Sequence, residues 1–520
     1  MTPTLAAAFD RVPPDRVALI ERGTPLRFGG IADRARGLAG GLSALGLCRG
    51  DRVALWLGNR REWLETLLAC ARLGVTVVAV NTRLGTVEVG DLLRRCEARA
   101  LVLAPEAGMR RPAEELAALE PAARATLETV IVVGDGAVHP GLAPRVVAFD
   151  ALAAGAPLGS IDAQPDDGLV VFTTSGTTSR PKLVLHGQCG VVRHARDVAA
   201  AFGLDAGDTV VLQALPLAGV FGFSQALATL LAGRALVMME SFDADSAASL
   251  MRAHAVTNLV GTNEMLDRML DARTETRPFP VLRFFGHANF NPALVELPAK
   301  AEARGVRLRG LFGMSETLAL FAIQPEGAIL ERRALAGGLP VSADARARIA
   351  DPESGALAAS GKAGELQVRG PSLFIGYLGD EAATRRAFTP DGWFRTGDIG
   401  IGLDDGGFTL LGRMGDTLRL GGYLVNPLEI EQVVAEDPSV AACQAVERNR
   451  RDGTRVIAFV VLAPGAALDE PALLARCRAK LAGYKVPARI VALDRFPTTD
   501  GPNGTKVRRA ELRAMAAALR

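Results

Sequence analysis

Short apolar runs alternate with amphipathic stretches through the first hundred residues of the chain. The runs have the length of β-strands, and the stretches between them repeat apolar positions at helical spacing. The pattern predicts strands over residues 52–57, 75–80 and 100–103, and helices over 28–45, 60–73 and 86–96. Gly74 directly follows one predicted helix, as is typical of a helix end. Alternation of this kind favours a parallel sheet covered by helices on both faces.

The same alternation returns after residue 168. It predicts strands over 168–172, 209–212, 235–239 and 258–260, and helices over 222–231 and 243–254. The segment between the two alternating regions, 105–168, is rich in Ala, Gly and Pro, and we expect one strand at 129–133 plus loops there. Near the C-terminus, helices are expected over 427–436 and 471–481, and strands over 456–462 and 490–493. This last group predicts a small α+β domain.

Length and charge narrow the class of protein. A chain of 520 residues is too long for a single core, so at least two domains are expected. A net charge of +2 gives no reason to expect nucleic acid or an acidic membrane as a partner. The sequence has no apolar run long enough to span a bilayer, and its start lacks the basic and apolar segments of a signal peptide. A cytoplasmic protein is expected.

Six cysteines lie far apart in the sequence, without a C-x-x-C pair and without clustered histidines. They are Cys48, Cys70, Cys96, Cys189, Cys443 and Cys477. This spacing argues against a zinc site and predicts buried free thiols in a reducing compartment.

The most informative stretch is 171–182, with the sequence V-F-T-T-S-G-T-T-S-R-P-K. Hydroxyl side chains and the backbone N–H groups of a tight turn can surround an anion, and Lys182 adds a positive charge. The stretch follows a predicted strand, and it lacks the Walker spacing G-x-x-x-x-G-K-[ST]. Taken alone, these residues could form a phosphate cradle or a polar surface turn.

Compared with known families, this stretch resembles the phosphate-binding loop of the adenylate-forming superfamily, which includes acyl-CoA synthetases, non-ribosomal peptide adenylation domains and luciferases. The family pattern is T-S-G-T-T-G-x-P-K-G. Residues 174–178, Pro181 and Lys182 match it, whereas Ser179 and Leu183 replace glycines. In that family the loop handles the β- and γ-phosphates of ATP.

Further strings resemble other motifs of the same family, in the family's order. They are P-L-A-G-V-F-G-F at 216–223, G-L-F-G-M-S-E-T at 310–317, G-E-L-Q-V-R-G at 364–370, D-G-W-F-R-T-G-D at 391–398, G-R-M-G-D at 412–416 and Y-K-V-P at 484–487. Many relatives have a histidine where this chain has Gly219. The resemblance covers nearly the whole chain and implies an α/β fold. A large N-terminal domain of parallel-rich sheets flanked by helices (1–414) would be followed by a smaller, mobile α+β domain (415–520).

The resemblance also implies a set of site residues. For ATP or AMP these are Thr174, Ser175, Gly176, Thr177, Thr178, Lys182, Gly286, Ala288, Phe312, Gly313, Ser315, Asp398 and Arg413. Catalytic roles would belong to Lys506, Thr177 and Glu316, and Glu316 would also bind Mg²⁺. The acid would lie against Phe221, His287, Ala288, Leu318, Ala319 and Leu320. Gly421 and Gly422 would contact CoA, and Met414 and Gly415 would form the hinge between the domains.

The implied reaction joins an acid to a thiol. A carboxylate attacks the α-phosphorus of ATP, pyrophosphate leaves, and the thiol of CoA then displaces AMP from the acyl group. The implied cofactors are ATP, Mg²⁺ and CoA. The apolar wall indicates a neutral fatty or aromatic acid, and an amino acid is disfavoured because the fourth motif lacks an aspartate for its ammonium group.

Two other interpretations stay open at this point. One is a stand-alone adenylation enzyme that loads an acyl carrier protein. The other is a catalytically silent member that serves as a binding module. The oligomeric state is also open, and a homodimer is compatible with the sequence.

Overall fold

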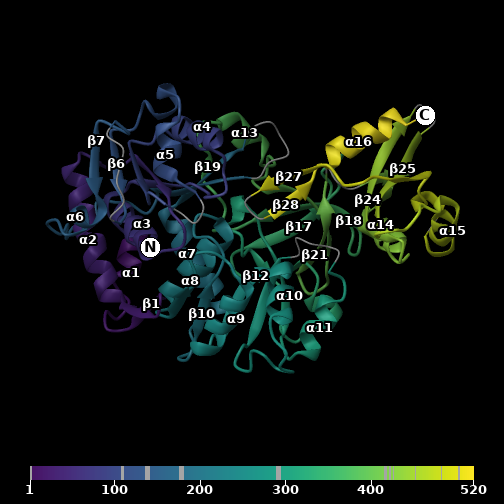
Figure 1. The fold of residues 1–520 in the computed structure, drawn as a ribbon, viewed down its shortest axis with the longest axis horizontal. Helices are drawn as coiled ribbons and strands as arrows, with labels where there is room; N and C mark the ends of the chain where they lie inside the picture. Colours follow the sequence, from purple (N-terminus) through teal and green to yellow (C-terminus); the bar gives the residue numbers. More distant parts are fainter. Residues whose placement is uncertain are drawn as a thin grey trace. The chain divides into compact units, whose positions relative to one another are not determined.

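The computed structural model describes residues 3–106, 110–134, 141–174, 181–288, 294–414, 418–420, 423–425, 427–450, 453–481, 483–501 and 504–519. Two compact units make up the chain (Figure 1). Unit 1 contains Met1–Phe290, Glu296–Arg346 and Arg369–Gly392, and unit 2 contains Asn291–Val295, Ala347–Val368 and Trp393–Arg520.

The first sheet of unit 1 is eight-stranded, in the order β19-β9-β8-β4-β3-β5-β6-β7. Its strands are β3 (Arg52–Trp56), β4 (Thr76–Ala79), β5 (Ala100–Leu103), β6 (Thr129–Val132), β7 (Arg145–Ala148), β8 (Gly168–Thr173), β9 (Leu183–Gly187) and β19 (Gly376–Tyr377). The strands from β8 to β7 pair in parallel, whereas β9 and β19 are antiparallel additions at one edge. Most side chains of the central strands are buried, as expected for a parallel sheet covered on both faces.

A second sheet in unit 1 has the order β16-β15-β14-β13-β12-β10-β11-β1-β2. Its strands are β1 (Val17–Glu21), β2 (Thr24–Arg27), β10 (Val210–Gln213), β11 (Ala235–Met238), β12 (Asn258–Thr262), β13 (Phe284–Ala288), β14 (Leu308–Phe312), β15 (Ala322–Ile323) and β16 (Gly337–Pro340). The run from β1 through β11, β10, β12 and β13 to β14 is parallel. The expected parallel-rich architecture is therefore confirmed.

Helices connect and cover these strands. They are α1 (Leu5–Phe9), α2 (Phe28–Ala44), α3 (Arg61–Leu73), α4 (Thr86–Cys96), α5 (Pro112–Ala117), α6 (Phe149–Ala153), α7 (Gln188–Ala201), α8 (Val220–Leu231), α9 (Ala244–Ala253), α10 (Asn263–Asp271), α11 (Leu297–Ala303), α12 (Leu330–Arg333) and α13 (Glu381–Arg386). Trp63 of α3 and Phe172 of β8 both make edge contacts with Phe223 of α8, so this aromatic belongs to the core. Gly74 ends α3 with φ of 73°, a left-handed conformation that suits glycine.

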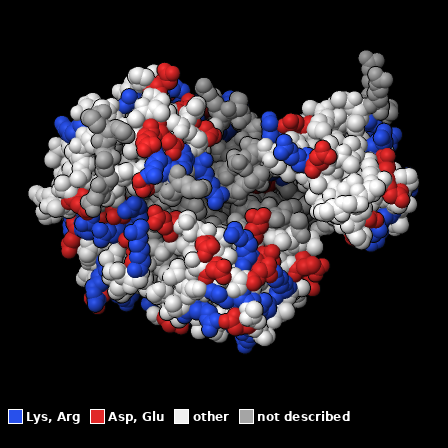
Figure 2. Space-filling view, viewed as in Figure 1, with Lys and Arg blue, Asp and Glu red and all other residues white. Residues whose placement is uncertain are grey.

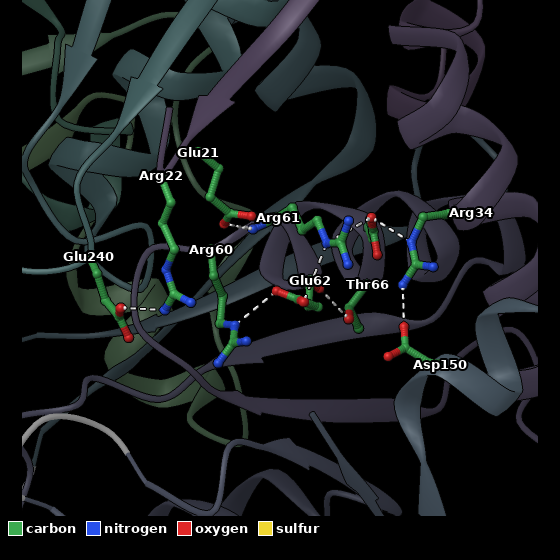
Figure 3. Close-up of polar contacts among 10 residues, drawn as sticks. Glu21, Arg22, Arg34, Arg60, Arg61, Glu62, Thr66, Asp150 and Glu240 are labelled. Atoms are coloured by element: carbon green, nitrogen blue, oxygen red, sulfur yellow. Dashed lines mark hydrogen bonds and ion pairs between the residues drawn. The ribbon is translucent and has the colours of Figure 1, made fainter. Parts of the chain in front are cut away.

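Charged residues tie the start of α3 to its neighbours (Figure 3). Arg34 of α2 donates to Glu65 at 2.9 Å and to Asp150 of α6 at 2.6 Å. Glu65 is 1% exposed, and burial raises the pKa of its carboxyl to about 7. Arg60 donates to Glu62 one turn earlier. These pairs fix α2, α3 and α6 against one another.

Unit 2 contains an antiparallel group in the order β17-β18-β20-β21 and a three-stranded sheet in the order β24-β25-β26. Its strands are β17 (Arg346–Ala350), β18 (Ala363–Arg369), β20 (Phe394–Gly402), β21 (Phe408–Arg413), β22 (Leu418–Leu420), β23 (Tyr423–Val425), β24 (Val440–Arg450), β25 (Gly453–Leu462), β26 (Arg489–Ala492), β27 (Thr498–Gly501) and β28 (Gly504–Val507). Its helices are α14 (Pro427–Ala435), α15 (Glu470–Lys480) and α16 (Arg509–Ala518). Val434, Ala458 and Leu473 belong to a buried cluster there, so the expected α+β region has a core of its own.

Two expectations differ from the structure. The segment 105–168 contains β7, α5 and α6 besides the expected strand, because helices of five or six residues are too short to give a helical repeat. Cys48 is exposed and Cys189 is partly exposed, whereas the other four cysteines are buried. Cys48 lies in the turn before β3, where its sulfur approaches an Asp51 carboxylate oxygen at 3.5 Å.

The surface matches the small net charge. On the face drawn in Figure 2, basic and acidic side chains are interspersed among neutral ones. No helix in the described ranges is long and apolar enough to cross a bilayer.

Candidate active site

The predicted phosphate loop connects β8 to β9, which form an antiparallel pair. Its two ends are joined by hydrogen bonds, because Thr174 N–H donates to the Lys182 carbonyl at 3.0 Å and Lys182 N–H donates to the Thr174 hydroxyl at 3.1 Å. Arg95 of α4 donates to the Pro181 carbonyl at 2.9 Å. The two ends of the loop are therefore held together, next to the end of β8 and the start of β9.

Four residues predicted to bind phosphate lie outside the described part of the chain. They are Ser175, Gly176, Thr177 and Thr178. The same is true of the predicted hinge residue Gly415 and of Gly421 and Gly422, which the resemblance assigned to CoA.

A tyrosine that the sequence analysis missed links two predicted site residues. The Tyr377 hydroxyl donates to Glu316 Oε1 at 2.9 Å, and the Lys182 Nζ lies 4.4 Å from the centre of the Tyr377 ring. Glu316 is 5% exposed, and its backbone carbonyl accepts from Phe374 N–H at 2.9 Å. Tyr377 of β19 thus contacts both the lysine of the phosphate loop and the predicted metal ligand, and it helps to position the two.

The chain makes a tight turn between β14 and β15. Leu318 and Ala319 both have positive φ, of 58° and 59°, which is uncommon for residues other than glycine. A Cβ added to Gly313 would lie 1.0 Å from the Ala319 carbonyl oxygen. Only glycine fits at that position, so Gly313 allows the turn to fold back on the end of β14. Phe312, the last residue of β14, is 5% exposed and makes an edge contact with Phe321.

Three polar side chains from other elements hold this turn. His186 Nε2 lies 2.7 Å from the Ser315 carbonyl oxygen, and His194 Nε2 lies 2.9 Å from the Leu318 carbonyl oxygen. The Ser224 hydroxyl donates to the same Leu318 carbonyl at 2.7 Å. Burial lowers the pKa of His186 to about 4 and that of His194 to about 3. Both imidazoles are therefore neutral near pH 7.

The residues predicted to line the acid site are divided between two faces of β13. Ala288 shares one face of β13 with Gly286, which was predicted to contact the nucleotide, because side chains alternate along a strand. A Cβ added to Gly286 would lie near Val260, Leu311 and Phe284. Leu320 lines a small cavity together with Phe284 and Gln225 of α8.

His287 points to the other face of β13, which it shares with Gly310 of β14 in register. It is 4% exposed, and burial lowers its pKa to about 4 against a smaller opposite effect from the Ala334 backbone. Phe221 is partly exposed in the first turn of α8, and Gly219 is the residue before that helix.

In unit 2, Asp398 of β20 and Arg413 of β21 are cross-strand partners. Arg413 Nε lies 3.0 Å from Asp398 Oδ1, and the same guanidinium donates to the Thr396 carbonyl at 3.1 Å. Asp398 is 5% exposed, whereas Met414, the first of the two predicted hinge residues, is 38% exposed. The carboxylate is thereby fixed, as recognition of a sugar diol would require.

Two lysines of unit 2 differ in position. Lys485 forms an ion pair with Glu429 of α14. Lys506 is in β28, where its backbone pairs with Thr499 of β27.

The described residues contain no group of three His, Cys, Asp or Glu side chains that could hold a metal on their own. A single buried carboxylate such as Glu316 fits Mg²⁺, which usually binds one or two carboxylates together with water and phosphate oxygens.

Comparison with known proteins shows which family this chain belongs to. A family model for AMP-binding enzymes matches residues 6–378, and a model for the AMP-binding enzyme C-terminal domain matches residues 429–501. The 2-succinylbenzoate–CoA ligase of Bacillus licheniformis is 31% identical over 487 residues, which cover 93% of this chain and 94% of the relative. A feruloyl-CoA synthase from an Amycolatopsis species is 31% identical, with 94% of each chain covered.

A similar solved structure is that of ATP-bound MatB from Rhodopseudomonas palustris. It has a TM-score of 0.85 and 27% sequence identity, and the match covers 100% of this chain and 99% of that chain. The chain therefore belongs to the adenylate-forming AMP-binding enzymes, among the AMP-forming acid–CoA ligases.

Proposed function

We propose that this ligase activates a neutral aromatic or fatty acid. The observation that carries the proposal is the single turn that holds both Glu316 and the apolar residues Leu318, Ala319 and Leu320. A carboxylate bound against these residues would lie beside the place where Glu316 would hold the triphosphate through Mg²⁺. Of the relatives named above, the feruloyl-CoA synthase is named for an aromatic acid with one carboxylate and supports the neutral class. The 2-succinylbenzoate–CoA ligase is named for an aromatic acid with two carboxylates, so it supports only the aromatic part of the proposal.

The roles of individual residues follow from their chemistry. Thr174 to Thr178 and Lys182 would surround the β- and γ-phosphates, Phe312 would stack on adenine, and Ser315 would donate to phosphate. Asp398 would accept hydrogen bonds from the ribose hydroxyls, with Arg413 holding it in place. When bound at Glu316, Mg²⁺ supplies neutralisation of the triphosphate charge.

The acid wall would consist of Phe221, Ala288, Leu318, Ala319 and Leu320. His287 lies on the opposite face of β13 from Ala288, and its assignment to the acid site stays a prediction. A wall without a buried cation suits an acid that has no second carboxylate, since a buried unpaired charge is costly.

We further propose that the domain boundary falls at Met414 and Gly415, with residues 415–520 as the mobile part. Adenylation and thioester formation need different groups at one centre, so the small domain must reorient between the two steps. Gly421 and Gly422 would contact CoA in the second step.

The test is a panel of acids assayed by pyrophosphate release, followed by thioester formation with CoA. We expect the largest kcat/KM among neutral aromatic acids. Better turnover of amino acids or dicarboxylates would overturn the proposed substrate class. Thioester formation with a phosphopantetheinyl carrier protein and not with CoA would favour the carrier-loading alternative.

A further inference from the structure

The turn between β14 and β15 is strained at two consecutive residues and is supported from outside. Leu318 and Ala319 have positive φ, and backbone hydrogen bonds join residues only two apart, Leu320 N–H to Leu318 at 2.8 Å and Phe321 N–H to Ala319 at 2.6 Å. Such conformations are unfavourable for residues other than glycine and persist only when the surroundings hold them. The residues that hold this turn therefore control its shape.

We propose that His194 and Ser224 are positioning residues that set the shape of the acid wall, and that His186 positions the nucleotide half of the same turn. Leu318, whose carbonyl His194 and Ser224 contact, belongs to the acid wall. Ser315, whose carbonyl His186 contacts, precedes Glu316. None of the three side chains needs to touch a substrate to have this effect.

Hydrogen-bond chemistry fixes the protonation of both histidines. A carbonyl oxygen can only accept, so Nε2 of each ring must carry the proton. Both rings are buried among described residues, and burial keeps them neutral. Each histidine therefore serves as a single N–H donor at a fixed place, and neither can act as a base through Nε2.

The donors come from elements that also adjoin other parts of the site. His186 is on β9, directly after the phosphate loop, and Ser224 is on α8, one turn beyond Phe221. His194 is on α7, which packs against α8. A change in any of these elements would thus be transmitted to the turn that carries Glu316 and Leu318. This inference rests on the proposed function only for the identity of the substrates.

The experiment compares replacements that remove or keep a donor. His194→Leu removes the N–H at similar volume, His194→Gln keeps an N–H donor, and Ser224→Ala removes the hydroxyl. His186→Leu and His186→Gln form the parallel pair. His254→Leu is the control, because this histidine lies after α9, away from the turn in the sequence.

We expect His194→Leu and Ser224→Ala to raise the KM for the acid about tenfold and the KM for ATP by less than about twofold, in line with the loss of one buried hydrogen bond. His186→Leu should instead raise the KM for ATP about tenfold and the KM for the acid by less than about twofold. The glutamine variants, which keep an N–H donor, should have KM values close to those of the wild type. Equal effects on both KM values, or glutamine variants as impaired as the leucine variants, would overturn the proposal.

Hydrogen–deuterium exchange of residues 314–322 gives a measurement that does not depend on activity. The amides of Leu320 and Phe321 should exchange about tenfold faster in His194→Leu than in the wild type. In His194→Gln they should exchange more slowly than in His194→Leu, and in His254→Leu they should exchange at the wild-type rate. Unchanged exchange in both His194→Leu and Ser224→Ala would overturn the proposal. If the wild-type chain activates no acid, the proposed function fails, and the exchange result still decides the positioning role. If His194→Leu does not fold, Ser224→Ala and His194→Gln carry the test.

Discussion

Gly313 has no room for a side chain, and this single position can be tested directly. A Cβ there would overlap the Ala319 carbonyl, so Gly313→Ala must push the turn away from β14. We expect a loss of about 1–3 kcal/mol in the free energy of unfolding, typical of overpacking, together with loss of pyrophosphate release. Urea denaturation and the pyrophosphate assay measure the two effects.

The matched control is Gly327→Ala. No atom lies within 4 Å of the Cβ that this substitution would add, so stability and activity should stay near wild type. Equal behaviour of the two variants would show that Ala319 can move away at little cost.

The buried histidines make stability depend on pH. The pKa values of His186, His194 and His287 are lowered to about 4, 3 and 4, below the value of about 6.5 for an unfolded chain. The unfolded state therefore binds protons first as pH falls. Each histidine's contribution to stability is complete above pH 6.5 and is lost as pH falls, toward pH 4 for His186 and His287 and toward pH 3 for His194. The loss reaches about 3 kcal/mol for each of His186 and His287.

Glu65 makes stability depend on pH in the opposite direction. Its pKa is raised to about 7, so its contribution is present at low pH and is lost as pH rises through 7. The measurement is therefore a difference, the free energy of unfolding of wild type minus that of His194→Gln, between pH 7.5 and 5. This difference should shrink as pH falls. A constant difference would mean that His194 is not held neutral.

Among the elements, the side-chain amide of Asn59 is one link between the two sheets of unit 1. Asn59, between β3 and α3, donates to the Leu215 and Met239 carbonyls at 2.9 Å each and accepts from Leu217 N–H at 2.7 Å. Leu215 and Leu217 lie between β10 and α8, and Met239 directly follows β11. The amide therefore connects the end of a strand in the first sheet to the ends of two strands in the second.

Asn59→Ala should leave several buried backbone groups unpaired, with a loss of about 3 kcal/mol in the free energy of unfolding. Because Leu217 leads into α8 and Phe221, the KM for the acid should also rise. Asn258→Ala is the comparison, since that amide is buried within β12 and donates to the Phe202 carbonyl. It should lower stability and leave the KM for the acid unchanged. A rise in KM for both variants would mean that any loss of stability loosens the acid site.

Periodicity and motif order predict the elements with strong local signals and miss those set by distant contacts. The helix expected over 60–73 ends at its glycine as predicted, because amphipathic spacing and a left-handed cap are local. In contrast, α5 and α6 are too short to show a repeat.

The same limit applies to the site. Glu316 could be found from its motif, whereas His194 and Ser224 act on a carbonyl about a hundred residues away. Nothing in their local sequence indicates that contact. Tyr377 is likewise recognisable only once β19 is paired with β9.

For the whole molecule, the two half-reactions should be separable by mutation at the small domain. Gly415 is the proposed hinge residue. The proposed catalytic lysine, Lys506, belongs to β28 of unit 2, and Asp398 and Arg413 belong to β20 and β21. If the small domain supplies a group that only one half-reaction needs, removing that group should slow that half-reaction and leave the other unchanged.

Lys506 is the residue on which this separation can be tested. The chain strongly prefers arginine, since only Lys182, Lys300, Lys362, Lys480, Lys485 and Lys506 are lysines among 59 basic residues. The family has one lysine in the phosphate loop and another in a C-terminal P-x-T-x-x-G-K-x-x-R pattern, and this chain has Lys182 and Lys506 at these places. The scarcity of lysine elsewhere supports both assignments. A compact ammonium suits a place between two anionic oxygens, where a planar guanidinium would need another approach.

Lys506→Ala should slow acid-dependent pyrophosphate release by a factor of about 10² to 10³, the usual cost of losing a preorganised charge. Conversion of a supplied acyl-adenylate to the CoA thioester should be largely spared, because the α-phosphate has by then been transferred. Lys485→Ala is the matched control, since Lys485 pairs with Glu429 and should affect neither step strongly. If Lys485→Ala abolishes adenylation and Lys506→Ala leaves it intact, the catalytic lysine is Lys485, and the extended hairpin of β27 and β28 has another role.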